Sequence, residues 1–144
     1  MRWPIMCAGL FGASVLVLAQ PLFTADDLDD SMKGVGRQFE LVNWAVSAGD
    51  YEGAKVRVTR AREQLSATIS FWRNSERADA VTMVRAATRR FDELDGVLSV
   101  LTIDADAVAA AVGDVRAACE ACHSVYREHD PATDTYRLKS GVLP

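Results

Sequence analysis

The chain has 144 residues, of which 49% are hydrophobic and 25% charged, the balance of a folded protein with a core of its own. Its net charge of −4 at pH 7 argues against nucleic acid as a partner, because binding to phosphates calls for a basic surface. The length predicts a single domain.

The N-terminal segment differs from the rest of the chain. Arg2 is its only charged side chain, and the stretch from Ile5 to Ala19 is almost wholly apolar. Small residues at its end offer a cleavage position, so residues 1–19 are predicted to be a secretory signal peptide. The alternative is a retained membrane anchor, since an apolar run of this length could barely span a bilayer. Cleavage would remove Cys7.

The first two helices are predicted from apolar residues that recur at steps of three and four. Thr24 and Asp27 form a candidate capping box for the first helix, and Gly49 is its predicted stop. Its stripe is Leu28, Met32, Val35, Phe39, Val42 and Val46. Asp50 is the predicted N-cap of the second helix, whose stripe is Ala54, Val58, Ala61, Leu65, Ile69 and Trp72. Basic residues off this stripe predict a solvated face or, alternatively, a docking patch for an acidic partner: Lys55, Arg57, Arg60 and Arg62.

Two further helices follow in the same way. Asn74 and Ser75 are predicted to cap the third helix, whose stripe is Ala80, Val84, Ala87, Phe91, Leu94, Leu98 and Leu101. The fourth begins near Asp104 and stops before Pro131, with the stripe Val108, Val112, Val115, Cys119, Cys122 and Tyr126. No convincing strand is visible, and residues 131–144 are predicted to be a tail or loop.

Short links between these segments make neighbouring helices antiparallel. The predicted fold is therefore all-α, an up-down-up-down four-helix bundle that occupies residues 20–130.

The run Cys119-Glu120-Ala121-Cys122-His123 is a C-x-x-C-H motif, which is typical of covalent haem attachment. The thiols of Cys119 and Cys122 would add to the haem vinyl groups, and His123 would bind the iron as an axial ligand. One alternative is a thiol redox pair, although that usually stands in a βαβ context. Another is a zinc site, although structural zinc sites usually offer four clear Cys or His ligands.

A distal iron ligand is predicted from the antiparallel register of the first and last helices. Counting 1.5 Å per residue from each end brings Met32 level with His123. Met83 ranks second, and His129 shares the helix of His123, so it cannot easily reach the opposite face. The alternative for Met32 is ordinary core filling. Gly34 and Gly36 predict room for a flat macrocycle or, alternatively, close helix packing.

The motif, its place on the last helix and the Tyr126-Arg127 pair after it resemble the class II cytochromes c, the cytochrome c′ family. The stretch from Met32 to Arg37 is similar to the family's first-helix pattern, whose leading position faces the distal side of the haem. A Met at that position is typical of the low-spin, electron-carrying branch, and a non-ligating residue of the high-spin branch. Arg127 is expected either to pair with a haem propionate or to be a solvated cation at the helix end.

The resemblance implies haem c with iron as the cofactor and a periplasmic, non-enzymatic electron carrier with His/Met ligation. The alternative is a five-coordinate protein that binds NO or CO. Redox partner proteins and a homodimer are expected as partners. The link at residues 73–75 is shorter than the family's usual loop, so one side of the pocket is expected to be open, with the tail covering it or contacting a partner.

Overall fold

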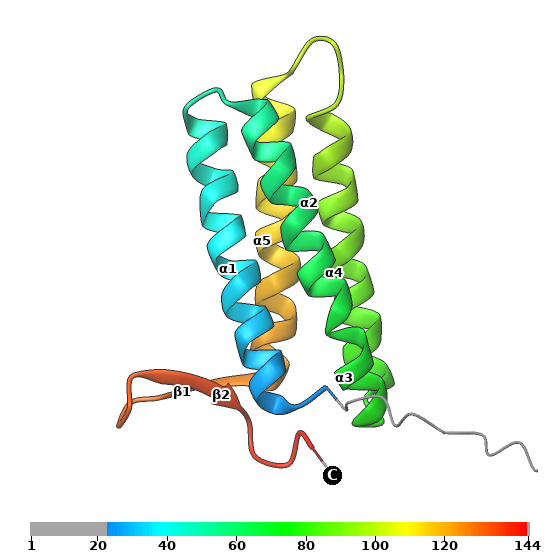
Figure 1. Cartoon of the computed structure of the whole chain (residues 1–144), viewed down its shortest axis with the longest axis vertical. Helices are drawn as coiled ribbons and strands as arrows, with labels where there is room; N and C mark the ends of the chain where they lie inside the picture. Colours follow the sequence, from blue (N-terminus) through cyan, green and yellow to red (C-terminus); the bar gives the residue numbers. More distant parts are fainter. Residues whose placement is uncertain (1–22, 144) are drawn as a thin grey trace, which may run out of the picture.

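Within residues 23–143, the part of the chain that the computed structural model describes, four long helices run alternately up and down (Figure 1). They are α1 (Ala25–Ser47), α2 (Tyr51–Ala67), α4 (Ala78–Val97) and α5 (Ala105–Tyr126), with the short α3 (Ile69–Asn74) between α2 and α4. The predicted four-helix bundle is confirmed. The predicted signal peptide or anchor lies outside the described residues. Among the described helices, none combines the length and apolar character needed to cross a membrane.

Two helices begin at the caps that the sequence predicts, and α5 begins beside Asp104, near the start predicted for the last helix. Thr24 and Asp27 form a complete capping box at the start of α1. Asp50 accepts a hydrogen bond from the backbone N–H of Gly53 at 2.9 Å, and Asp104 caps α5. Gly49 has a φ of 73°, a left-handed conformation that ends α1 at little cost for glycine.

The core lies between the helical stripes. Helix α1 packs on α2, α2 on α4 and α4 on α5, whereas close backbone approaches between α1 and α5 are sparse. Apolar side chains from all four long helices are buried where the stripes meet, including Val42, Val58, Ala61, Phe91, Leu94, Val108 and Val115. The bundle is therefore well packed on three of its four sides, and the side between α1 and α5 is the loose one.

The second and third helices differ from the sequence prediction at their ends. The second helix breaks at Thr68, whose buried hydroxyl donates to the carbonyl of Leu65 at 2.7 Å and competes with the helical ladder. Asn74 and Ser75 do not cap α4, because the Ser75 N–H bonds back to Phe71 and closes α3 instead. Helix α4 starts at Ala78 without a side-chain cap.

Leu101 was expected in the core and lies outside it. Helix α4 ends at Val97, and the next residues turn the chain toward α5, so the Leu101 side chain is fully exposed. The other six residues of the predicted stripe are buried. The predicted stripe is thus one turn longer than the helix, because a heptad pattern does not show where the chain must turn back.

The prediction that the chain has no strand is wrong. Strand β1 (Arg127–Asp130) and strand β2 (Thr135–Leu138) form an antiparallel hairpin that projects from the lower end of the bundle (Figure 1). Cross-strand side-chain pairs stabilise it, namely Glu128 with Arg137 and the ring of His129 with that of Tyr136. Such pairs involve residues that face each other only after the chain has turned, so periodicity did not reveal them.

The residues after the hairpin return to the bundle. Lys139 donates from its backbone N–H to the carbonyl of Tyr126 at 2.9 Å and from Nζ to the carbonyl of Ser124 at 2.6 Å. Val142 is buried, and its carbonyl accepts a hydrogen bond from Arg77 at 2.8 Å. The predicted tail is thus an ordered segment that covers the space beside the short link before α4.

Candidate haem-attachment site

The C-x-x-C-H motif lies on the last turns of α5. This helix forms because Asp104 caps it and alanines, which favour helices, fill much of its length. Cys119 and Cys122 are three residues apart, so they share one side of the helix, where both pack partly buried against the core. Both thiols are free. His123 is also partly buried.

Burial shifts the pKa of all three functional groups of the motif. Burial and, to a smaller extent, the positive charge of Arg127 lower the pKa of His123 to about 4. The imidazole is therefore neutral at pH 7, which is the form that binds a metal. Burial raises the pKa of Cys119, and it raises that of Cys122 to about 11 with smaller effects from Cys119 and Asp79.

Contacts between α1 and α5 set the register of these two antiparallel helices. The Arg116 guanidinium lies over the ring of Phe39 at 5.6 Å and donates a hydrogen bond to Oδ1 of Asn43 at 3.2 Å. His123 follows Arg116 by seven residues, and Met32 precedes Phe39 by seven. Seven residues are about two helical turns, so this register brings Met32 about level with His123 along the axis of the bundle.

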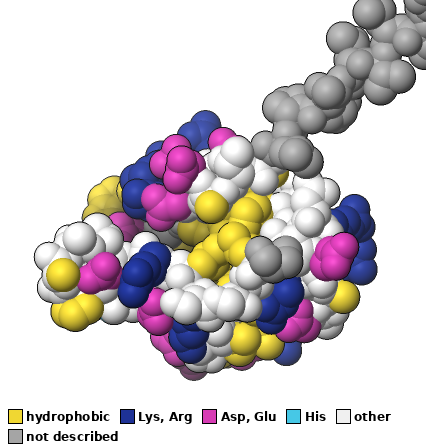
Figure 2. Space-filling model, turned by 90° about the horizontal axis from the view of Figure 1, so that it is seen from below, with side chains coloured by type: hydrophobic (Ala, Val, Ile, Leu, Met, Phe, Trp, Pro, Cys, Tyr) yellow, Lys and Arg dark blue, Asp and Glu magenta, His cyan; other side chains and the backbone are white. Residues whose placement is uncertain are grey.

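Met32 is partly buried and packs against the core from the α1 side. Seen from below, the lower end of the bundle is hollowed, and apolar side chains line the hollow (Figure 2). Arg90 of α4 approaches Asp114 of α5 at 3.9 Å. Met83 precedes Arg90 by seven residues, and Ala121 of the motif follows Asp114 by seven. Met83 of α4 is therefore also at about the level of the motif. Both sequence candidates for the distal ligand therefore lie at about the level of the motif along the bundle.

The two glycines of α1 have different surroundings. A Cβ on Gly34 would lie 2.8 Å from Oε1 of Gln64, so this glycine allows close packing of α1 on α2. A Cβ on Gly36 would meet nothing within 4 Å. Gly36 is one turn from Met32 on the same side of the helix. Of the two alternatives, close helix packing therefore explains Gly34, whereas only Gly36 has open space where its side chain would be.

An aromatic cluster closes the lower end beside the motif. The ring of Tyr126 lies 5.0 Å from that of Trp72, and both side chains are buried. Nε1 of Trp72 has no hydrogen-bond partner among the described residues. Arg77 lies over the Tyr126 ring at 4.9 Å. Sequence reasoning did not single out Arg77, since its partners are distant in the chain.

The remaining candidates of the sequence analysis lie apart from the motif. His129 is in the hairpin, where its Nε2 lies 3.0 Å from Oδ1 of Asp134. Arg127 is exposed at the C-cap of α5, which agrees with the expected cation at the helix end, and its guanidinium lies over the ring of Tyr136 at 4.1 Å. Within residues 23–143, no three side chains of His, Cys, Asp or Glu are grouped as ligands of a metal ion.

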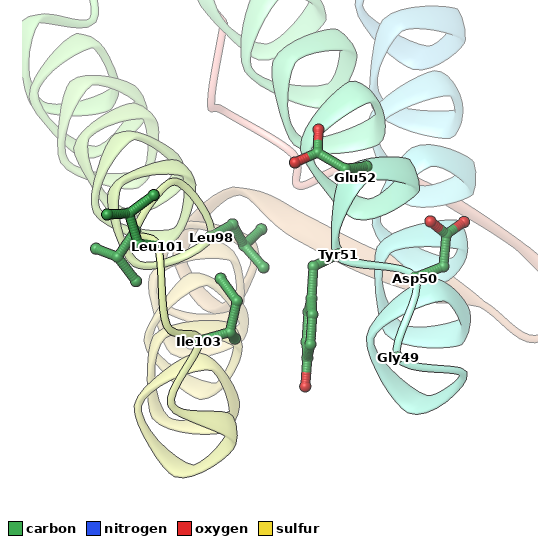
Figure 3. Close-up of a pocket in the computed structure, with 8 residues that line it drawn as sticks. Gly49, Asp50, Tyr51, Glu52, Leu98, Leu101 and Ile103 are labelled. Atoms are coloured by element: carbon green, nitrogen blue, oxygen red, sulfur yellow. The ribbon is translucent and has the colours of Figure 1, made fainter.

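A shallow pocket of about 340 Å³ lies at the opposite end of the bundle. Figure 3 shows the ring of Tyr51 beside Leu98 and Ile103, where the α1–α2 and α4–α5 turns meet. It contains no Cys, His or Met, and it is far along the helices from the motif. The residues that could bind a cofactor therefore lie at the lower end of the bundle, where α5 carries the C-x-x-C-H motif.

The two partly buried thiols and the neutral imidazole of the motif fit a covalently attached haem. A four-helix bundle with this motif on its last helix defines a c-type cytochrome. The model of the family described as Cytochrome C′ matches residues 40–127, more than half of the chain, and the chain belongs to this family. No curated protein and no solved structure matches it.

Membership in the family identifies the cofactor as haem c with iron. Proteins of this family are mainly electron carriers or gas-binding haemoproteins and are typically periplasmic. The matched residues include Cys119, Cys122 and His123 but begin after Met32. The family match therefore leaves open which group, if any, closes the sixth position of the iron.

Proposed function

We propose that this cytochrome is a periplasmic electron carrier, without enzymatic activity, whose haem is bound by Cys119 and Cys122 and ligated by His123 and Met32. Periplasmic location suits the motif, since bacteria attach haem to such sites outside the cytoplasm. The observation that supports the proposal is the contact of Arg116 with Phe39, because the register that it indicates brings Met32 about level with His123.

Each residue has a distinct task in this proposal. Cys119 and Cys122 hold the haem covalently, and His123 ligates the iron through its neutral imidazole. Met32 closes the other face, which excludes outside ligands and raises the reduction potential. When bound, haem supplies the one-electron couple between ferrous and ferric iron. The protein positions the cofactor, excludes competing ligands and tunes the potential.

The second candidate function is gas binding by a five-coordinate haem. The match to the Cytochrome C′ model favours it. In this case Met32 would be only a core residue that borders the distal side.

The experiment that tests the proposal compares Met32→Ala with Met83→Ala in the haem-loaded protein. Both methionines are partly buried at the core, so the second variant controls for lost packing. Optical spectra of the ferric and ferrous forms report spin state and methionine ligation. Carbon monoxide added to the ferrous form reports whether the sixth position is free.

Met32→Ala is expected to convert a low-spin spectrum to a high-spin one and to increase the affinity for carbon monoxide, while Met83→Ala leaves both unchanged. The opposite pattern would assign the ligand to Met83. A wild-type protein that is already high-spin and binds carbon monoxide readily would contradict the carrier proposal and support gas binding.

A further inference from the structure

A chain of contacts joins α1 to α5 two turns above the motif. The Asn43 side chain donates from Nδ2 to the carbonyl of Phe39 at 2.6 Å, which fixes its amide. Its Oδ1 then accepts the hydrogen bond from Arg116 at 3.2 Å. The Arg116 guanidinium also lies over the Phe39 ring. We call the Arg116–Asn43 hydrogen bond and the Arg116–Phe39 stacking the α1–α5 bridge.

The bridge is tied to the core. The ring of Phe39 packs edge-on against that of Phe91 with centroids 6.0 Å apart. Phe91 belongs to α4 and is completely buried. Because Phe39 packs against a buried ring, its side chain cannot shift freely. Its contact with Arg116 therefore fixes the position of Arg116 relative to the packed core of the bundle.

The bridge spans the side of the bundle where packing is weakest. Close backbone approaches between α1 and α5 are sparse, in contrast to the other neighbouring pairs. In the described part of the chain, no other side-chain hydrogen bond or ion pair joins these two helices. The spacing of α1 from α5 therefore depends on few contacts besides the bridge.

We propose that Arg116 is a positioning residue that holds α1 at the distance from α5 at which Met32 reaches the haem iron. Arg116 lies about 10 Å along the axis from His123, and Phe39 lies equally far from Met32. A change of spacing at the bridge is transmitted along the two rigid helices to this pair. The inference rests on the proposed ligation by Met32.

Two variants of the haem-loaded protein test the bridge. Asn43→Ala removes the acceptor and keeps both the charge of Arg116 and its stacking on Phe39, whereas Arg116→Ala removes the hydrogen bond, the stacking and the charge. Arg60→Ala is the matched control, because Arg60 is exposed on α2 and lies in none of the ion pairs of the described residues. Both bridge residues lie toward the surface, and helical circular dichroism checks that the variants fold.

Both bridge variants are expected to raise the affinity of the ferrous protein for carbon monoxide about fivefold, the change for a lost hydrogen bond of about 1 kcal/mol. They should also weaken the charge-transfer band of the ferric protein that marks methionine ligation. Arg60→Ala should change neither. An effect of Arg116→Ala alone would show that the hydrogen bond to Asn43 does not hold the spacing of the helices and would overturn the inference, as would unchanged values in both variants.

The proposed function and this inference fail in different ways. If Met32→Ala leaves the spectrum unchanged, the ligation proposal fails whatever the bridge does. If Met32→Ala changes the spectrum but Asn43→Ala and Arg116→Ala do not, Met32 is the ligand and the bridge does not position it.

Discussion

Arg77 and Tyr126 hold the start of α4 against the end of α5, with the guanidinium 4.9 Å from the centre of the phenol ring. Arg77 also forms a two-point ion pair with Asp79, whose oxygens lie 3.1 and 2.9 Å from its Nε and Nη2. Because Tyr126 is one turn beyond Cys122, this group supports the turn of α5 that carries the motif. The lower end of the bundle depends on it.

We expect Asp79→Asn to lower the melting temperature at pH 7. The Arg77 guanidinium holds the pKa of the Asp79 carboxyl well below its ordinary value of 3.8. A lowered pKa in the folded state contributes stability above pH 3.8, and this contribution is lost as the pH falls through the folded-state pKa. The difference from wild type should therefore shrink below pH 3.8 in a thermal-denaturation series.

Glu63→Gln is the control for that series, since Glu63 is an exposed carboxylate on α2 outside the ion pairs of the described residues. It should leave the melting temperature nearly unchanged at every pH. A difference between Asp79→Asn and wild type that stays constant down to pH 2 would contradict the assignment of the effect to the charged pair.

The attachment residues predict a graded loss of covalent haem. Cys119→Ser and Cys122→Ser should each leave one thioether bond, and the double variant should leave none. The pyridine haemochrome spectrum, whose main band shifts with the number of thioether bonds, measures this directly. Ser124→Ala, on the same helix, is the control and should retain both bonds. Covalent haem in the double variant would refute the attachment at these cysteines.

Two leucines of the same predicted stripe should respond differently to truncation. Leu94 is completely buried, so Leu94→Ala is expected to reduce the free energy of unfolding by about 2–5 kcal/mol. Leu101 is fully exposed, so Leu101→Ala should change it by no more than about 0.5 kcal/mol. Urea denaturation of the two variants checks the pair, and equal losses would show that the core extends into the α4–α5 turn.

The glycines of α1 should also differ. Gly36→Ala is expected to stabilise the protein by about 0.5–1 kcal/mol, because a helical alanine costs less entropy and its Cβ meets nothing. Gly34→Ala should stabilise the protein less, because the new Cβ would force the end of the Gln64 side chain to move, and this cost opposes the gain in entropy. Urea denaturation measures both. A larger gain for Gly34→Ala would contradict close packing of α1 on α2 at this position.

Patterns within one helix explain how much of this protein could be predicted from its sequence. The stripe residues Val42, Val58, Phe91 and Val108 are buried as expected, and the predicted caps at Thr24 and Asp50 are in place. These features depend on neighbours within a few positions. The hairpin and the uncapped start of α4 were missed, because they depend on pairs that form only after the chain has turned.

By itself, the sequence determined the class of the protein and its cofactor, because the C-x-x-C-H motif and the helical periodicity both involve residues that are close together in the chain. Only the tertiary structure decided how α1 meets α5. Arg116 and Asn43 are 73 positions apart, and their contact brings Met32 level with His123 while the two helices stay loosely packed. Contacts over such a separation arise from the packing of the whole bundle.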